Sequence, residues 1–186
     1  MRHKYSTSGI VLARTPIREA GMLITLLTPD LGLVRARAEG VRRSGAKLAH
    51  ALQTLCEADC MLVRGKEGWR LTGAVLAESR FIGLTAASRT RIARVATLLL
   101  RLVHGEADDA TLYQEFVAFI ESVPGLSPED AEAAESLVVL RLLHQLGFDA
   151  GEKPPEGYDA LALGYVPTRH IELIARINRG IAASSI

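Results

Sequence analysis

The chain has 186 residues, 48% of them hydrophobic and 23% charged, and a formal net charge of +1 at pH 7. This composition is typical of a globular protein with a buried core, and it excludes a disordered or collagen-like chain. No apolar run reaches the roughly 18 residues of a membrane-spanning helix, and no signal peptide follows the basic first residues. We therefore expect a cytoplasmic protein that does not bind membranes.

Strands fill the first part of the chain. Apolar runs and alternating patterns, separated by turn residues, predict strands over residues 5–13, 22–28, 34–39, 58–64 and 69–78. Gly9 is expected to mark a bend or bulge in the first strand, and residues 15–21 are expected to form a turn. Pro29 and Gly32 suit a tight hairpin between the second and third strands.

A short helix is predicted between the third and fourth strands. Apolar residues recur at helical spacing between residues 46 and 55, at Leu48, Ala51, Leu52 and Leu55. Five short strands with one helix between the third and the fourth is the order of an OB-fold barrel. We therefore predict an α+β fold, with an OB-fold barrel in residues 1–80 and an all-helical domain in residues 81–186.

Basic side chains concentrate where the third strand runs into the next loop. Small apolar residues alternate with arginines over residues 34–38, so the arginines are predicted on the open face of the strand. Such a charge run can be a solvated surface and nothing more. It can also be a surface that follows a phosphate backbone, as OB-folds do across strands two and three. The cations concerned are Arg35, Arg37, Arg42, Arg43 and Lys47.

Further basic residues lie at strand ends or on predicted exposed faces, and they are weaker candidates for the same surface: Arg14, Arg64, Lys66 and Arg70. Tyr5 and Trp69 are the aromatic candidates for stacking on bases. The period-two pattern of the fifth strand predicts an inward face made of Trp69, Leu71, Val75 and Ala77. Trp69 is therefore expected in the core.

From residue 85 onward the apolar spacing is helical. Thr85, Asp109 and Ser127 are predicted to cap three successive helices, and the proline and two acids after Ser127 strengthen the third prediction. Thr168 is predicted to cap a last helix. Its buried stripe is expected to hold Ile171, Ile174, Ala175 and Ile177.

The small net charge hides a difference between the two halves of the chain. Residues 1–80 hold 13 Lys and Arg against 7 Asp and Glu, a net charge of +6, whereas residues 81–186 hold 9 against 14, a net charge of −5. This asymmetry favours contact with a polyanion in the first half. The helical half either covers one end of the barrel or binds a short acidic and apolar tail, for which the available cations are Arg89, Arg91, Arg94 and Arg101.

The sequence offers no constellation for catalysis or metal binding. Cys56 and Cys60 are the only cysteines, and no histidines are paired at ligand spacing, so no metal and no cofactor are expected. Two buried thiols are expected instead. No nucleotide-binding glycine loop, GxSxG or HExxH motif occurs, and we expect a protein that is not an enzyme.

The segment GIVLARTPIREAGMLITLLTPDLGLVRARAEGVRRSGAKL, residues 9–48, resembles the opening of the RecO family of recombination mediators. The matching features are the GIVL strand, the basic turn ending in Glu19, the LLTPDLG hairpin and GVRRSGAKL after the third strand. The chain continues similarly through LVRG to a fifth strand, so the detailed resemblance covers residues 4–80. The basic positions that carry over are Arg35, Arg37, Arg42, Arg43 and Lys47.

The resemblance implies a non-enzymatic, nucleoid-associated DNA repair and recombination factor. RecO proteins bind single- and double-stranded DNA, anneal complementary strands, and associate with RecR and with the acidic tail of single-strand-binding protein. With these partners they load the RecA recombinase onto coated strands. The rival interpretation of the residues is an OB-fold adaptor that binds RNA or only protein.

Two features depart from the family pattern. After Glu19 come Ala20, Gly21 and Met22, where we expect an acidic and then a basic residue at the last two places. Many RecO proteins carry a four-cysteine zinc element in the helical domain, but residues 148–167 contain no cysteine. We therefore predict no structural zinc, and the chain is expected to be a short form of the family.

Overall fold

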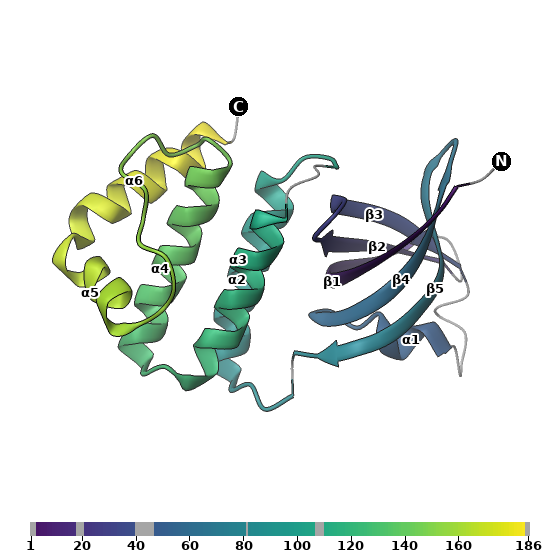
Figure 1. Cartoon of the computed structure of the whole chain (residues 1–186), viewed down its shortest axis with the longest axis horizontal. Helices are drawn as coiled ribbons and strands as arrows, with labels where there is room; N and C mark the ends of the chain where they lie inside the picture. Colours follow the sequence, from purple (N-terminus) through teal and green to yellow (C-terminus); the bar gives the residue numbers. More distant parts are fainter. Residues whose placement is uncertain (1–2, 18–20, 40–46, 81, 107–109, 185–186) are drawn as a thin grey trace. The chain divides into compact units, whose positions relative to one another are not determined.

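The computed structural model describes residues 3–17, 21–39, 47–80, 82–106 and 110–184. The chain divides into two compact units (Figure 1), one built from residues 1–83 and 103–113 and the other from residues 84–102 and 114–186. The first unit is a barrel of strands, and the second is a set of packed helices. The predicted α+β class, with an amino-terminal OB-fold barrel and a helical domain, is confirmed.

Five strands close the barrel in the order β1-β2-β3-β5-β4 (Figure 1). β1 pairs with two neighbours, with β4 through residues 4–10 and with β2 through residues 10–17, which is how the sheet closes on itself. All pairs are antiparallel except the short parallel contact of β3 with β5. The strand bounds are β1 Lys4–Ile17, β2 Gly21–Thr28, β3 Gly32–Ala38, β4 Cys56–Gly65 and β5 Gly68–Ser79.

Apolar side chains from all five strands and from the segment around α1, Lys47–Ala51, fill the barrel interior. α1 is shorter than the helix predicted over residues 46–55. α1 ends at Ala51, and Leu55 then takes a φ of 63° and donates its N–H to the Val11 carbonyl over 2.7 Å, which leads the chain into β4. Ala51 and Leu52 nevertheless pack in the core as the helical spacing predicted.

β1 is longer and more irregular than predicted. The turn expected over residues 15–21 is wrong at its start, because β1 runs on to Ile17, which pairs with Gly21. The bulge lies between Val11 and Ala13 and not at Gly9. Gly9 is required for a different reason: a Cβ there would lie 2.9 Å from the Thr28 side chain, so the two strands approach too closely for any larger residue.

A bulge also changes the inward face of β5. Leu71 pairs with Leu62, but the next pair joins Gly73 to Met61, so one extra residue is inserted into β5. The insertion reverses which side chains point inward, and Val75 is 68% exposed where it was predicted to be buried. Ala77 is exposed for the same reason, and the side chains that pack against the core beyond the bulge are Ala74 and Leu76.

The helical unit is organised around α4, which contacts α2, α5 and α6 (Figure 1). Two predicted caps are confirmed: Thr85 Oγ1 accepts the Ser88 N–H over 3.1 Å, and Ser127 Oγ accepts the Asp130 N–H over 3.1 Å. The predicted cap at Asp109 lies outside the described residues. None of the described helices has the length and apolar character needed to cross a bilayer. The helices are α2 Ala86–Leu102, α3 Thr111–Ser122, α4 Pro128–Gln145, α5 Ala160–Thr168 and α6 His170–Ala183, with a 3-10 turn at Val123–Gly125.

The last two helices differ from the prediction. α5 was not predicted, although Asp159 caps it by accepting the Ala162 N–H over 2.8 Å. Thr168 is the last residue of α5 and not a cap, since its hydroxyl donates back to the Gly164 carbonyl over 3.1 Å. The buried residues of α6 are Leu173, Arg176 and Gly180, whereas Ile171 and Ile174 are exposed and Ala175 and Ile177 only half-buried.

α6 turns this way because Arg176 belongs to a buried ion pair. Its guanidinium donates to Asp149 Oδ1 over 3.1 Å and Oδ2 over 2.5 Å, and to the Glu152 carbonyl over 2.7 Å. Hydrogen bonds and charge from Arg176 hold the pKa of Asp149 below its ordinary value, although burial acts in the opposite direction. The polar contact therefore decides which face of α6 packs inward, against the apolar pattern of its isoleucines.

Candidate nucleic-acid interface

The outward face of β3 presents two arginines side by side. Arg35 and Arg37 are exposed, while Val34, Ala36 and Ala38 between and beside them are fully buried, which confirms the predicted alternation. Alternate residues of a strand point to the same side, so both guanidinium groups lie outside the barrel. The buried side chains between them pack in the barrel core on the other side of the strand.

The barrel topology adds a third arginine to this face. The parallel contact of β3 with β5 places Arg37 directly beside Arg70, and Arg70 is exposed. We call Arg35, Arg37 and Arg70 the arginine face. Lys66 lies next to it in the turn that joins β4 to β5, and it is exposed too.

Two carboxylates reduce the charge of the arginine face without removing it. Arg37 Nη1 lies 2.5 Å from Glu67 Oε2, with the two side chains 48% and 81% exposed, and Glu39 is also exposed at the end of β3. An exposed ion pair of this kind contributes only about 0–1 kcal/mol, so a phosphate can compete for the guanidinium. Among the described residues, no carboxylate pairs with Arg35, Arg70 or Lys66.

Arg64 lies at the rim of the barrel in a cluster with aromatic side chains. Its guanidinium carbon is 4.8 Å from the centre of the Trp69 ring, and Tyr5 meets that ring edge-to-face with centroids 5.0 Å apart. Glu106, from the segment that follows α2, pairs with Arg64 and accepts the Trp69 indole N–H over 2.9 Å. Trp69 is buried, as predicted. We call these four residues the rim cluster.

The electrostatics of the rim cluster centre on Glu106. Burial alone would raise the pKa of its carboxyl, but hydrogen bonds from Arg64 and Trp69 hold that pKa below its ordinary value. The carboxylate therefore stays ionised at neutral pH and offsets the charge of Arg64. Nothing in the sequence around Glu106 pointed to this contact, because it joins residues 42 positions apart.

The remaining predicted cations are placed elsewhere or lie outside the described residues. Arg14 pairs with Ile24 across β1 and β2, so it shares the inward face of that core residue and does not join the arginine face. Lys47 begins α1, but its side chain is outside the described part of the chain. Arg42 and Arg43 also fall outside it.

The arginines predicted to bind a protein tail are on α2. Arg91 Nη1 lies 2.7 Å from Glu135 Oε2, and Arg94 Nε lies 2.5 Å from Glu135 Oε1, so one carboxylate of α4 pairs with both. These ion pairs hold α2 against α4. Arg89 and Arg101 are exposed on the same helix. A pocket of about 410 Å³ in the helical unit lies along α5 and is lined by residues that include Leu161 and Tyr165. None of these four arginines lines it.

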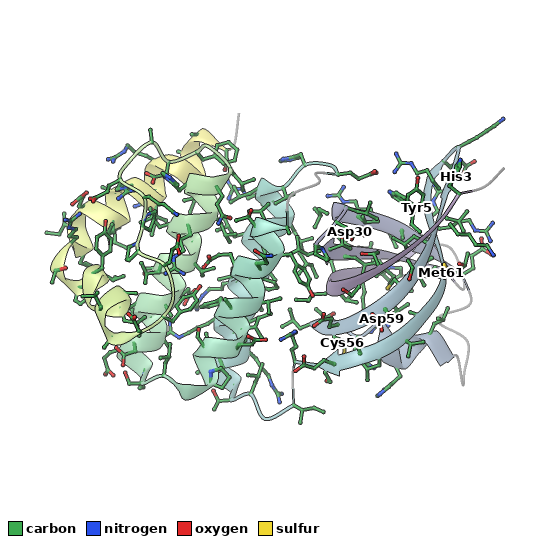
Figure 2. The ribbon with its side chains drawn as sticks, in the orientation of Figure 1. His3, Tyr5, Asp30, Cys56, Asp59 and Met61 are labelled. Atoms are coloured by element: carbon green, nitrogen blue, oxygen red, sulfur yellow. The ribbon has the colours of Figure 1, made fainter. Side chains whose placement is uncertain are left out.

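The two cysteines are buried free thiols, as predicted. Burial, and next to it the charge of Asp59, raises the pKa of the Cys60 thiol to about 12. Figure 2 labels Cys56 and Asp59 on the barrel with their neighbours. Among the described residues, no group of three or more His, Cys, Asp or Glu side chains could hold a metal ion.

The sequence of the first unit is similar to that of a known protein family. Residues 1–80 match the family described as Recombination protein O N terminal. A DNA repair protein RecO of Dehalococcoides mccartyi is 30% identical over 132 residues, 68% of this chain and 51% of the relative. The protein of the same name from a second strain is 26% identical over 148 residues, 78% of this chain and 57% of the relative.

Another relative has a higher identity over a shorter alignment. The DNA repair protein RecO of Synechococcus elongatus is 42% identical over 71 residues, 38% of this chain and 27% of the relative. The chain thus spans about half the length of the Dehalococcoides relatives with the longer alignments.

Proposed function

Because the chain belongs to the RecO family, we propose that it is a DNA repair and recombination factor whose barrel binds single- and double-stranded DNA without reading the sequence. The observation that carries the proposal is the arginine face: three exposed guanidinium groups on two neighbouring strands of an OB-fold barrel. The names of the similar proteins from Dehalococcoides and Synechococcus support the role in repair.

The binding is carried by phosphate contacts. The arginine face and Lys66 offer four fixed cations and no exposed aromatic side chain between them, which suits a phosphate backbone better than base edges. Binding through such contacts is independent of sequence and weakens steeply with salt. Arg42, Arg43 and Lys47 stay predicted DNA contacts.

The finer activities of the family follow as part of the proposal. A barrel that holds two strands by their backbones leaves the bases free to pair, which suits annealing of complementary strands. Loading of the recombinase requires RecR and the acidic tail of single-strand-binding protein as partners. The helical unit, with its arginines on α2, is the proposed site for the tail.

A binding comparison tests the proposal. We would measure fluorescence anisotropy of single-stranded DNA, duplex DNA and RNA of equal length with the wild type and with Arg35→Ala/Arg70→Ala. Lys153→Ala/Arg179→Ala removes the same charge from the helical unit and is the matched control. Loss of two phosphate contacts should weaken DNA binding by roughly tenfold or more, while the control binds like the wild type.

Two outcomes would contradict the proposal. Equal weakening by both double variants would mean that only overall charge matters. Binding to RNA with no binding to DNA, or no nucleic-acid binding by the wild type, would favour the adaptor interpretation instead.

A further inference from the structure

The rim cluster combines a rigid exposed aromatic ring with a ready-made anion site. Tyr5 lies at the end of the barrel where β1 begins (Figure 2) and is 40% exposed. Trp69 is 6% exposed, so it supports the cluster from below and Tyr5 is its accessible ring. The edge-to-face contact between the rings, 83° apart, fixes Tyr5 before any ligand arrives.

The anion site is defined by the carboxylate that occupies it. Glu106 accepts from two donors at once, the Arg64 guanidinium and the Trp69 indole N–H. A phosphate oxygen needs the same kind of donors. The Arg64 and Glu106 side chains are 47% and 41% exposed, so solvent, and therefore a phosphate, can reach the pair. Glu106 is tied to the barrel by a backbone bridge to Gly32, which keeps its carboxylate near this position.

The cluster is continuous with the arginine face. Arg64 pairs with Trp69 across β4 and β5, and the next residue of β5 is Arg70, which lies beside Arg37. The turn between the two strands carries Glu67, the partner of Arg37. A strand whose phosphates follow the arginine face therefore needs only a short step to reach the rim.

We propose that the rim cluster is a subsite for one unpaired nucleotide, in which Tyr5 stacks on the base and Arg64 takes the phosphate that Glu106 now replaces. The inference rests on the proposed DNA binding and adds a preference for single strands to it. A duplex cannot use the subsite, because its bases are stacked and paired and offer no free face to Tyr5. Glu106 is a competing acid that a nucleotide must displace.

Four variants and one native signal test the subsite. Tyr5→Leu removes the ring, Tyr5→Phe keeps it, Glu106→Gln removes the competing charge, and Met61→Ala is a control at another exposed apolar residue of the barrel. Trp69 is the only tryptophan, so its fluorescence reports on the rim directly. Circular dichroism establishes that each variant is folded before its affinities for single strands and duplexes are compared.

Stacking of one base is lost in Tyr5→Leu, which should weaken single-strand binding by about 5- to 150-fold and leave duplex binding unchanged. Tyr5→Phe and Met61→Ala should bind like the wild type. Glu106→Gln should bind single strands more tightly, with a salt dependence steeper by about 0.7 in slope. Single strands, and not duplexes, should change the fluorescence of Trp69.

Tyr5→Leu with unchanged or equally weakened binding to both forms of DNA would overturn the subsite. The proposed function would survive that result as long as Arg35→Ala/Arg70→Ala still weakens both. A wild type that binds no DNA overturns both proposals together.

Discussion

Gly151 is the position where one added methyl group should damage the helical unit most. A Cβ there would lie 2.4 Å from Cζ of Arg176 and 2.5 Å from its Nε and Nη2. Arg176 is 4% exposed and is held by both carboxylate oxygens of Asp149 and by the Glu152 carbonyl. The guanidinium is therefore not free to move, and the added methyl group of Gly151→Ala must displace it from its hydrogen-bond partners.

The expected loss follows from the buried ion pair. Breaking such a pair while both charges stay buried costs about 3–5 kcal/mol. At ~3 kcal/mol, and with about 4–8 °C of Tm for each kcal/mol in a unit of this size, the Tm should fall by about 12–24 °C. Thermal denaturation followed by circular dichroism measures this. Gly164→Ala is the control: its Cβ meets nothing within 4 Å in α5, so it should be neutral or stabilise by up to about 1 kcal/mol.

A double variant decides whether the guanidinium is the cause. With Arg176→Met in place, the flexible thioether can give way, and the added cost of Gly151→Ala should shrink by several kcal/mol, roughly the energy of the broken pair. An alanine that costs as much beside methionine as beside arginine would refute the reasoning.

Three further predictions concern titratable groups. Arg176 lowers the pKa of Asp149 in the folded protein. The stabilisation that this carboxylate gives the fold is therefore present above its unfolded pKa of about 3.9, and it is lost as pH falls through the folded value. The free energy of unfolding should thus fall less steeply with falling pH in Asp149→Asn. Burial, and next to it the charge of Asp59, raises the pKa of the Cys60 thiol to about 12. Cys60 should therefore resist alkylation near pH 8 in the folded protein and react at once in urea. Fast alkylation without denaturant would show that the thiol is accessible. Burial, and next to it the hydrogen bond to Glu57, raises the pKa of Tyr113. Glu57→Gln should therefore move the ultraviolet titration of this tyrosine to lower pH and lower the free energy of unfolding by about 1–3 kcal/mol. An unmoved titration would show that the bond is absent in solution.

Local patterns in the sequence predicted the elements that local physics decides. The alternation on β3, the hairpin at Gly32 and the cap at Ser127 all formed as expected, because each depends on residues a few positions apart. The two arginines of β3 were likewise expected on its open face, and Arg35 and Arg37 are exposed there. The position of these two residues outside the barrel was thus accessible from sequence alone.

Contacts between distant residues were not accessible in this way. Arg70 joins Arg37 only through the parallel contact of β3 with β5, and Glu106 reaches Arg64 from a segment beyond α2. The bulge in β5 reverses its inward face, because one extra residue lies between the pairs that Leu71 and Gly73 make with β4. Arg176 determines which face of α6 is buried, because a buried charge must keep its partner. This requirement outweighs the gain from burying the isoleucines of the helix.

The salt dependence of duplex binding tests the arginine face most directly. Each phosphate contact contributes about 0.9 to the slope of log K against log salt, so Arg35→Ala/Arg70→Ala should lower the slope by about 1.8. Between about 50 and 200 mM salt, the loss of affinity should then be smaller than that of the wild type by a factor of about 12. A slope equal to that of the wild type would show that nucleic acid does not lie on this face of the barrel.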